Sequence, residues 1–129
     1  MKLWQNNFMK KLTIFLSIYF LSITISAKEI FFECEMEDNR LGIAKANIVY
    51  NPETTTASLE SNYMGNKGDG MRNYKVVDLR VTSTELIIGH SVYGLNYNPD
   101  FRINRENLEI SGPGGRKGKC KIIKKELAF

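Results

Sequence analysis

Cys34 and Cys120 are the two cysteines of the chain, and their number and wide separation predict a disulfide bond between them. A catalytic or metal-binding cysteine pair would need a base or further ligands nearby, and the sequence has no such cluster around either residue. In the chain-entropy description, a crosslink that closes so long a loop stabilises a domain by roughly 4–5 kcal/mol. We therefore predict one disulfide that joins the first and last strands of the folded domain.

Other side chains suited to catalysis are few. His90 is the only histidine, and a lone histidine at a strand end is typical of a hydrogen-bonded structural residue. No Gly-x-Ser-x-Gly motif is present. Most carboxylates alternate along the N-terminal strand region, where pairing on a solvent face explains them better than acid–base catalysis. The sequence therefore predicts no catalytic residue, no cofactor and no enzymatic activity.

Asn66–Gly70 contains some of the residue types of a calcium-binding loop. Such a loop needs carboxylates at alternate positions and a glutamate at its twelfth position, where this chain has Val77. A zinc site would need three or four ligands, which the chain could supply only by using its disulfide cysteines. We predict a turn at Asn66–Gly70 and no metal site.

The segment from Tyr63 to Tyr74 is the strongest candidate for binding a partner. It is a long stretch rich in glycine and asparagine, and loops of that length are often functional. Tyrosine, methionine and arginine are enriched in protein–protein contacts. The alternative is an ordinary loop whose tyrosines cover the end of the core. The candidate contact residues are Tyr63, Met64, Met71, Arg72 and Tyr74.

The N-terminus has the layout of a secretory signal peptide. Lys10 and Lys11 precede a run of uncharged, largely apolar residues from Leu12 to Ile25, and the small residue Ala27 follows. This run is shorter than the roughly 20 residues of a membrane-spanning helix. We predict a signal-peptide helix over residues 1–27, cleavage after Ala27, and a periplasmic or secreted product without a stable membrane span.

Removing residues 1–27 also changes the charge balance. Three of the 18 basic residues and none of the 14 acidic residues lie in that segment, so the mature chain is nearly neutral. Overall basicity therefore gives no support to a nucleic-acid partner. About 102 residues remain, which is enough for a single domain over residues 28–129.

The mature chain is patterned as short strands. Apolar and polar residues alternate over 29–37, 41–50, 54–60, 74–82, 85–89, 101–103, 108–110 and 118–123, with turn residues between them. A further short strand is expected over 91–97, with a bulge or bend at Gly94. Eight or nine strands without a helix predict an all-β domain, either an antiparallel β-barrel or a β-sandwich.

Charges predict the register of the first and last strands. If Cys34 lies opposite Cys120 on antiparallel strands, Glu33 faces Lys121, and the same register produces four further pairs of opposite charge: Glu29–Lys125, Glu35–Lys119, Glu37–Lys117 and Asp38–Arg116. Most of the basic residues from Arg116 to Lys125 would then be neutralised across the strands rather than bind an anionic surface. The alternative is a disulfide that crosses between two sheets, with both strands charged on their solvent faces.

The layout of a small exported β domain with a cysteine near each end resembles the bacterial periplasmic inhibitors of C-type lysozyme. Gly70-Met71-Arg72-Asn73-Tyr74 is similar to the Ser-Gly-x-x-Tyr motif of their inhibitory loop, although Asp69 stands where that motif has serine. The tryptophan-containing strand of that family is missing, because the only tryptophan is Trp4. The resemblance covers five residues and the layout, and we transfer no functional residue from it.

Size, predicted export and the lack of a catalytic constellation favour binding over catalysis. We expect a small exported binding protein, most simply a protein-directed inhibitor or immunity-type module whose partner lies in the cell envelope or outside the cell. Two alternatives remain open. One is a β-barrel carrier of a small molecule or lipid, and the other is a structural protein of the cell envelope without a discrete ligand.

Overall fold

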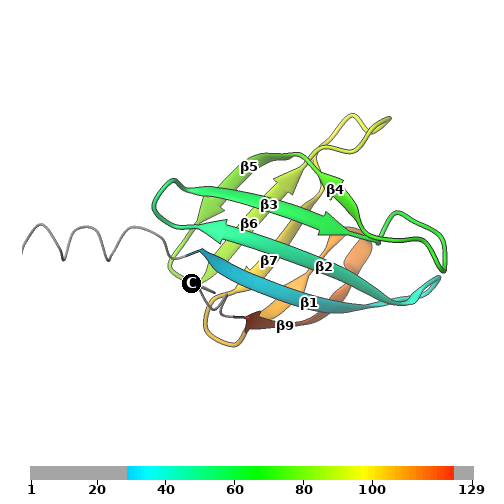
Figure 1. The fold of residues 1–129 in the computed structure, drawn as a ribbon, viewed down its shortest axis with the longest axis horizontal. Coiled ribbons are helices and arrows are strands. Elements are labelled where there is room, and N and C mark those ends of the chain that lie inside the picture. Colours follow the sequence, from blue (N-terminus) through cyan, green and yellow to red (C-terminus); the bar gives the residue numbers. More distant parts are fainter. Residues whose placement is uncertain (1–28, 124–129) are drawn as a thin grey trace, which may run out of the picture.

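The computed structural model of the protein describes residues 29–123, and it is an all-β domain (Figure 1). The predicted signal peptide, residues 1–27, lies outside the described residues. No helix within residues 29–123 is long and apolar enough to cross a membrane. The elements are, in order, β1 (Ile30–Asp38), β2 (Gly42–Asn51), β3 (Thr56–Ser61), β4 (Arg72–Tyr74), β5 (Val76–Val81), β6 (Glu85–His90), β7 (Asp100–Asn104), β8 (Glu109–Ser111), the short 3₁₀ helix η1 (Pro113–Gly115) and β9 (Lys117–Ile123).

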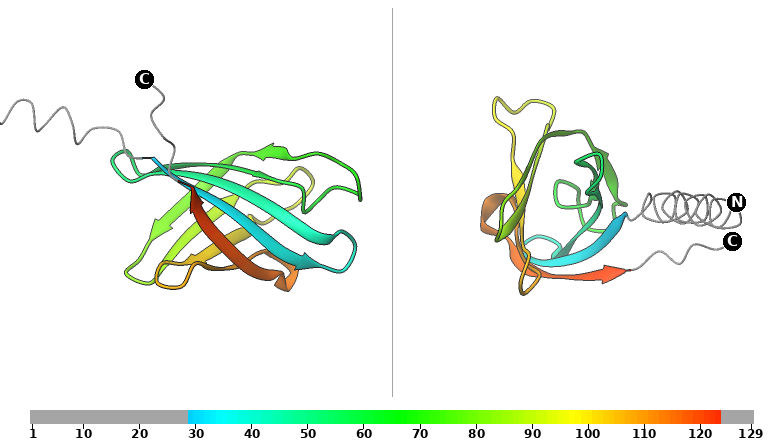
Figure 2. Two further views of the ribbon diagram at one scale, coloured as in Figure 1. Left: turned by 60° about the horizontal axis from the view of Figure 1, so that its bottom comes forward. Right: turned by 90° about the vertical axis from the view of Figure 1, so that its left-hand side faces the viewer.

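These strands form one antiparallel sheet in the order β4-β3-β2-β1-β9-β8-β7-β6-β5. Hydrogen-bonded neighbours follow one another along the chain, except that β1 also pairs with β9 and thereby joins the first strand to the last. The sheet curls round on itself, as the right-hand view of Figure 2 shows. Its two edges, β4 and β5, are separated in the chain by Lys75 alone, and β3 lies beside β5 across the remaining gap. The domain is therefore a nearly closed barrel and not a sandwich.

The β1–β9 register agrees with the prediction. Cys34 lies opposite Cys120, and the two form the only disulfide among the described residues, with Cα atoms 4.0 Å apart. Glu33 faces Lys121, and Lys121 Nζ lies 3.7 Å from a carboxylate oxygen of Glu33. The four further predicted pairs have different outcomes. Glu35 faces Lys119 in the ladder, and Asp38 and Arg116 form an ion pair just beyond it. Glu37 and Lys117 lie just past the last ladder pair, Met36 and Gly118, and the pair of Glu29 with Lys125 involves a residue outside the described range.

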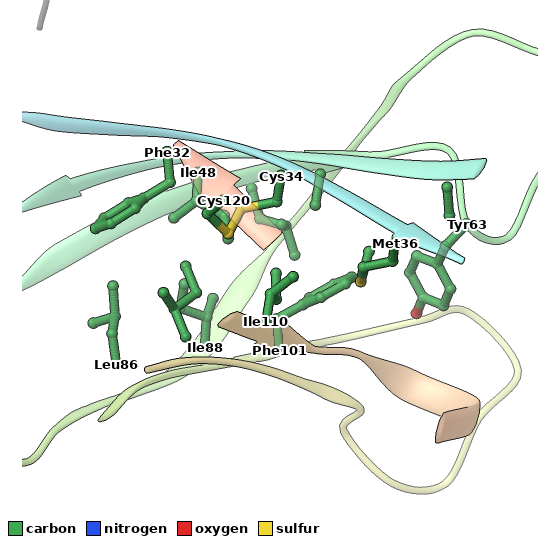
Figure 3. Packing of buried hydrophobic residues seen from close by; sticks show 14 residues of the cluster. Phe32, Cys34, Met36, Ile48, Tyr63, Leu86, Ile88, Phe101, Ile110 and Cys120 are labelled. Carbon is green, nitrogen blue, oxygen red and sulfur yellow. A yellow bond between two sulfur atoms is a disulfide. The ribbon is translucent and has the colours of Figure 1, made fainter. Parts of the chain in front are cut away.

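The core is a continuous apolar cluster inside the barrel. Alternate residues of each long strand point inward because successive side chains of a strand lie on opposite faces. Figure 3 shows them meeting between the two walls of the barrel, with the disulfide among them. These side chains occupy the interior of the barrel at this level. The inward residues that Figure 3 labels are Phe32, Cys34, Met36, Ile48, Tyr63, Leu86, Ile88, Phe101, Ile110 and Cys120.

Two segments differ from the sequence prediction. The strand expected over 91–97 is wrong: these residues form a loop, because Gly94 adopts a left-handed conformation with φ of 87° and the amide of Leu95 donates to the carbonyl of Val92 in a tight turn. Conversely, β4 lies within the stretch that the sequence marked as a long loop. It pairs with β3 over three residues. A bulge around Val77 then separates the two first pairs of β5 with β6.

Candidate functional site

Four connections gather at one end of the barrel, which we call the loop end. They are the β1–β2 turn, the β3–β4 loop, the β6–β7 loop and the β8–β9 connection that contains η1. Figure 1 shows this end on the right, with the β6–β7 loop projecting at the top. Antiparallel strands bring these loops together because the chain reverses direction at each of them. The two longest connections between the described strands, the β3–β4 loop and the β6–β7 loop, therefore lie at the same end of the barrel.

Tyr63 lies at the centre of the loop end and is almost completely buried. Its hydroxyl lies 2.7 Å from Nε2 of His90, which is also buried. The Tyr63 ring meets the rings of His90 and Phe101 edge-on, and the ring of Tyr74 lies beside it. These aromatic contacts and the hydrogen bond hold the β3–β4 loop against β6 and β7.

Burial changes the pKa values of this cluster. It lowers the pKa of His90 below 6.5, because the cationic form loses its hydration inside the barrel. The same loss of hydration raises the pKa values of Tyr63 and Tyr74, because the charged form of tyrosine is the deprotonated anion. His90 is therefore neutral at pH 7 and acts as a hydrogen-bonded core residue. This placement agrees with the structural role that the sequence favoured.

An ion pair lies beside Tyr63 at the loop end. Nε of Arg116 donates to Oδ2 of Asp38 at 2.6 Å, and the Asp38 side chain is only 2% exposed. Oδ1 of Asp38 accepts hydrogen bonds from the backbone amides of Arg40 and Leu41. The amide of Leu41 contributes most to lowering the pKa of Asp38, to about 2, and the hydrogen bond from Arg116 adds to it.

Two guanidinium groups converge on one backbone oxygen. Nη2 of Arg40 donates to the carbonyl of Tyr63 at 2.9 Å, and Nη2 of Arg116 donates to the same oxygen at 3.5 Å. The Arg116 guanidinium also lies 5.2 Å from the centre of the Tyr63 ring, within range of a cation–π interaction. Tyr63 thus contacts the arginines with its backbone and His90 with its hydroxyl.

The structure separates the five residues predicted to bind a partner. Tyr63 is buried and has no surface to present, and Tyr74 is half-buried against it, so these two tyrosines cover the end of the core. Met64 and Arg72 are exposed and Met71 is half-buried. A direct contact through the Tyr63 side chain is therefore excluded in this conformation. A binding role for Met64, Met71 and Arg72 stays a prediction.

The β6–β7 loop, residues 91–99, was not identified from the sequence as a binding segment. Tyr93 is fully exposed, Tyr97 is 63% exposed and Leu95 is 39% exposed. The run Tyr-Gly-Leu-Asn-Tyr-Asn-Pro combines two aromatic residues with glycine, asparagine and proline, which are residues of turns. That combination indicates an aromatic loop, and it was hidden by the apparent strand alternation.

Backbone hydrogen bonds fix the base of this aromatic loop. The amide of His90 donates to the carbonyl of Pro99 at 2.9 Å and closes the loop at its two ends. The amide of Ser91 donates to the carbonyl of Lys75 at 3.0 Å and attaches the loop to the corner between β4 and β5. The base of the loop is therefore fixed, while Tyr93, Leu95 and Tyr97 are exposed.

No group of three or more histidine, cysteine or carboxylate side chains within residues 29–123 is placed to hold a metal ion.

Comparison with known proteins found no matching protein family, no matching curated protein and no matching solved structure.

Proposed function

We propose that the protein is an exported binding module that recognises a protein partner through its aromatic loop, in the manner of an inhibitor or immunity-type protein. The observation that carries this proposal is the full exposure of Tyr93 at the tip of a projecting loop, with Tyr97 and Leu95 exposed beside it. Figure 2 shows the loop standing out from the barrel wall. Such a convex, aromatic segment suits a concave site on a partner.

The energetics of the aromatic loop support this proposal. Each tyrosine can bury on the order of 150–250 Å² in a complex, and few-rotamer aromatic side chains lose little conformational entropy on binding. The hydrogen bonds at the base, and the turn closed by Leu95 and Val92, already order part of the loop backbone in the free protein. A smaller part of the binding energy is therefore spent on ordering the loop when the partner binds.

The rest of the barrel is consistent with this role. The disulfide between Cys34 and Cys120 suits the oxidising compartment that the predicted signal peptide implies. Core side chains from both walls lie in the interior of the barrel, which supports binding at the surface rather than carriage of a ligand inside. We therefore place the recognition surface at the loop end.

Capture of a partner followed by measurement of its affinity tests the proposal. Mature protein is used as bait for envelope and culture fractions in three forms: wild type, the loop variant Tyr93→Ser/Tyr97→Ser, and the control variant Ile122→Ser/Ile123→Ser. The control removes two exposed apolar residues from the end of β9 that lies away from the loop end. The captured protein is then purified and titrated with each form by calorimetry. We expect a stoichiometric complex that the control retains.

Two interface tyrosines at hot-spot positions each contribute about 2 kcal/mol or more, which corresponds to roughly 30-fold in the dissociation constant. The loop variant should therefore bind at least about 30-fold more weakly than the control variant. If the captured partner is an enzyme, its turnover should fall in proportion to added wild-type protein. Equal binding by all three forms, or no stoichiometric complex with any of them, would contradict the proposal.

A further inference from the structure

A hollow of about 430 Å³ opens at the loop end between the β1–β2 turn and the β8–β9 connection. It is lined by residues 37–40 on one side and 114–117 on the other. We call it the arginine pocket, because Arg40 and Arg116 line it from opposite sides. Gly114 and Gly115 leave its wall without side chains, so backbone and guanidinium groups are accessible there.

Arg116 is held rigidly in this pocket. Its Nε donates to the buried carboxylate of Asp38, and its Nη1 donates to the carbonyl of Pro113. A Cβ atom at Gly114 would lie 2.8 Å from Nη1 of Arg116, so a larger residue there would displace the guanidinium. The glycine, which has a φ of 72°, therefore serves the placement of Arg116 as well as the turn.

One hydrogen bond orients Arg40 and leaves most of its hydrogen-bond donors available. A guanidinium carries five N–H donors, and the side chain of Arg40 uses one of them, for the carbonyl of Tyr63. Its other donors have no partner within the described part of the chain, and the residue is exposed. An arginine whose direction is fixed by one bond loses less conformational entropy when it binds a ligand.

The charges around the pocket do not cancel. Asp38 neutralises Arg116, and both of its oxygens are already engaged. Among the lining residues, Arg40, Arg116 and Lys117 oppose Glu37 and Asp38, which leaves a net charge of +1. Glu37 and Lys117 are both exposed, so their charges are screened by solvent more than that of the enclosed Arg116. The pocket therefore has an excess of positive charge and free donors at Arg40.

We propose that the arginine pocket binds a carboxylate of the protein partner, from an acidic side chain or a C-terminus. A carboxylate carries one negative charge, which matches the excess charge of the pocket, and it accepts two parallel hydrogen bonds from a guanidinium. This inference extends the proposed function, because Tyr63 joins the pocket to His90 at the base of the aromatic loop. A partner that covers the loop end would contact both the aromatic loop and the pocket, and its acidic group would enter the pocket.

A titration that needs no partner tests this pocket separately from the aromatic loop. Isotopically labelled mature protein is followed by NMR while three probes are added at constant ionic strength: the peptide acetyl-Gly-Glu-Gly-amide, the matched acetyl-Gly-Gln-Gly-amide, and sodium phosphate. We expect saturable shifts of the Arg40, Gly114, Gly115 and Arg116 amides with the glutamate peptide and none with the glutamine peptide. Phosphate should bind more weakly than the glutamate peptide.

Variants show whether Arg40 causes the binding. Arg40→Gln should raise the dissociation constant of the glutamate peptide by about tenfold or more, since a charge-assisted hydrogen bond is lost. Arg40→Lys keeps the charge and should bind with intermediate affinity. The matched control is Arg105→Gln, because Arg105 is also exposed and also donates to one backbone carbonyl, that of Thr82, at the other end of the barrel. It should leave the affinity unchanged.

Three results would overturn the carboxylate pocket: equal shifts with both peptides, unchanged affinity in Arg40→Gln, or tighter binding of phosphate than of the glutamate peptide. None of them depends on the aromatic loop. Failure of the loop proposal would appear instead as equal partner binding by the Tyr93→Ser/Tyr97→Ser variant. The two proposals can therefore fail independently.

Discussion

Replacing Cys34 and Cys120 together by alanine should lower the free energy of unfolding by about 3–5 kcal/mol. The two residues are 86 positions apart in sequence, and the chain-entropy relation assigns a loop of that length about 4.6 kcal/mol at 25 °C. Both cysteines are also buried in the core, so removing their sulfur atoms leaves small voids. Crosslinks commonly contribute less than the entropy relation gives, and the expected range allows for this.

That loss is large for a domain of this size. Stability of roughly 0.05–0.15 kcal/mol per residue corresponds to about 5–14 kcal/mol for the described part of the chain. The variant should therefore retain the β1–β9 ladder only marginally, because the six paired positions of that ladder must then hold without the covalent bond.

Urea denaturation followed by circular dichroism measures the effect. Oxidised wild type, wild type with a reductant and the double alanine variant are compared, because the reduced wild type keeps both sulfur atoms and isolates the contribution of the crosslink. The reduced protein should lose most of the 3–5 kcal/mol, and the alanine variant should lose slightly more. A loss below about 1 kcal/mol in both would refute the reasoning, since closing the long loop would then contribute little.

Three further predictions concern the loop end and the β1–β9 pair. The pKa of His90 is lower in the folded protein than in the unfolded chain, so the free energy of unfolding should decline as pH falls from about 6.5 through the folded pKa. His90→Phe should flatten this decline in urea titrations between pH 7 and 5, and an unchanged slope would be inconsistent with a buried neutral His90. The pKa of Asp38 is about 2 in the folded protein, so its contribution to the free energy of unfolding should be complete above pH 3.8 and disappear as pH falls through 2. Asp38→Asn should lower the free energy of unfolding by about 1.5–3 kcal/mol at pH 7 and weaken the dependence on acid in thermal unfolding. A Cβ at Gly118 would collide with the backbone carbonyl of Glu35, so Gly118→Ala should lower the free energy of unfolding by about 3 kcal/mol or more. The variant should also contain free thiols that a thiol reagent detects. Full oxidation with wild-type stability would disprove the close approach of β1 and β9.

The sequence was most informative where neighbouring strands are fixed by side-chain pairs. Glu33 and Lys121 lie on the same register as Cys34 and Cys120, so charge and sulfur chemistry independently indicated the same pairing. Strand alternation identified most of the strands, because a barrel wall has one buried face and one solvated face and its sequence therefore alternates between apolar and polar residues. The pairing of β1 with β9 could therefore be predicted although these strands are far apart in the sequence.

The loop end was harder to predict because neighbours across the barrel decide it. Tyr63 follows Ser61 and Asn62 and precedes a glycine-rich stretch, so its local pattern indicates a surface loop. Its burial comes from contacts with His90 and Phe101, which belong to strands on the other wall. Residues 91–97 have the alternation of a strand but no neighbouring strand to pair with. Gly94, which adopts a left-handed conformation, and the nearby asparagine and proline residues were the local indications of a loop.

The two arginines of the arginine pocket differ in how far the sequence predicted them. The pairing of Asp38 with Arg116 was predicted from the β1–β9 register, because it extends that ladder by regular steps. The part played by Arg40 was not, since a turn residue has no fixed direction until a partner such as the Tyr63 carbonyl orients it. Sequence reasoning therefore reached the ion pair and missed the second arginine that makes the pocket.

The position of the disulfide has a mechanical consequence. Ile30 begins β1 and Ile123 ends β9, and the antiparallel register places these two ends together. A force that pulls them apart acts on the ladder one pair at a time, beginning with Phe31 and Ile123. It would open only the pairs up to Glu33 and Lys121 before it reached the bond between Cys34 and Cys120. The load then passes from one sulfur atom to the other, and the seven strands from β2 to β8 carry none of it.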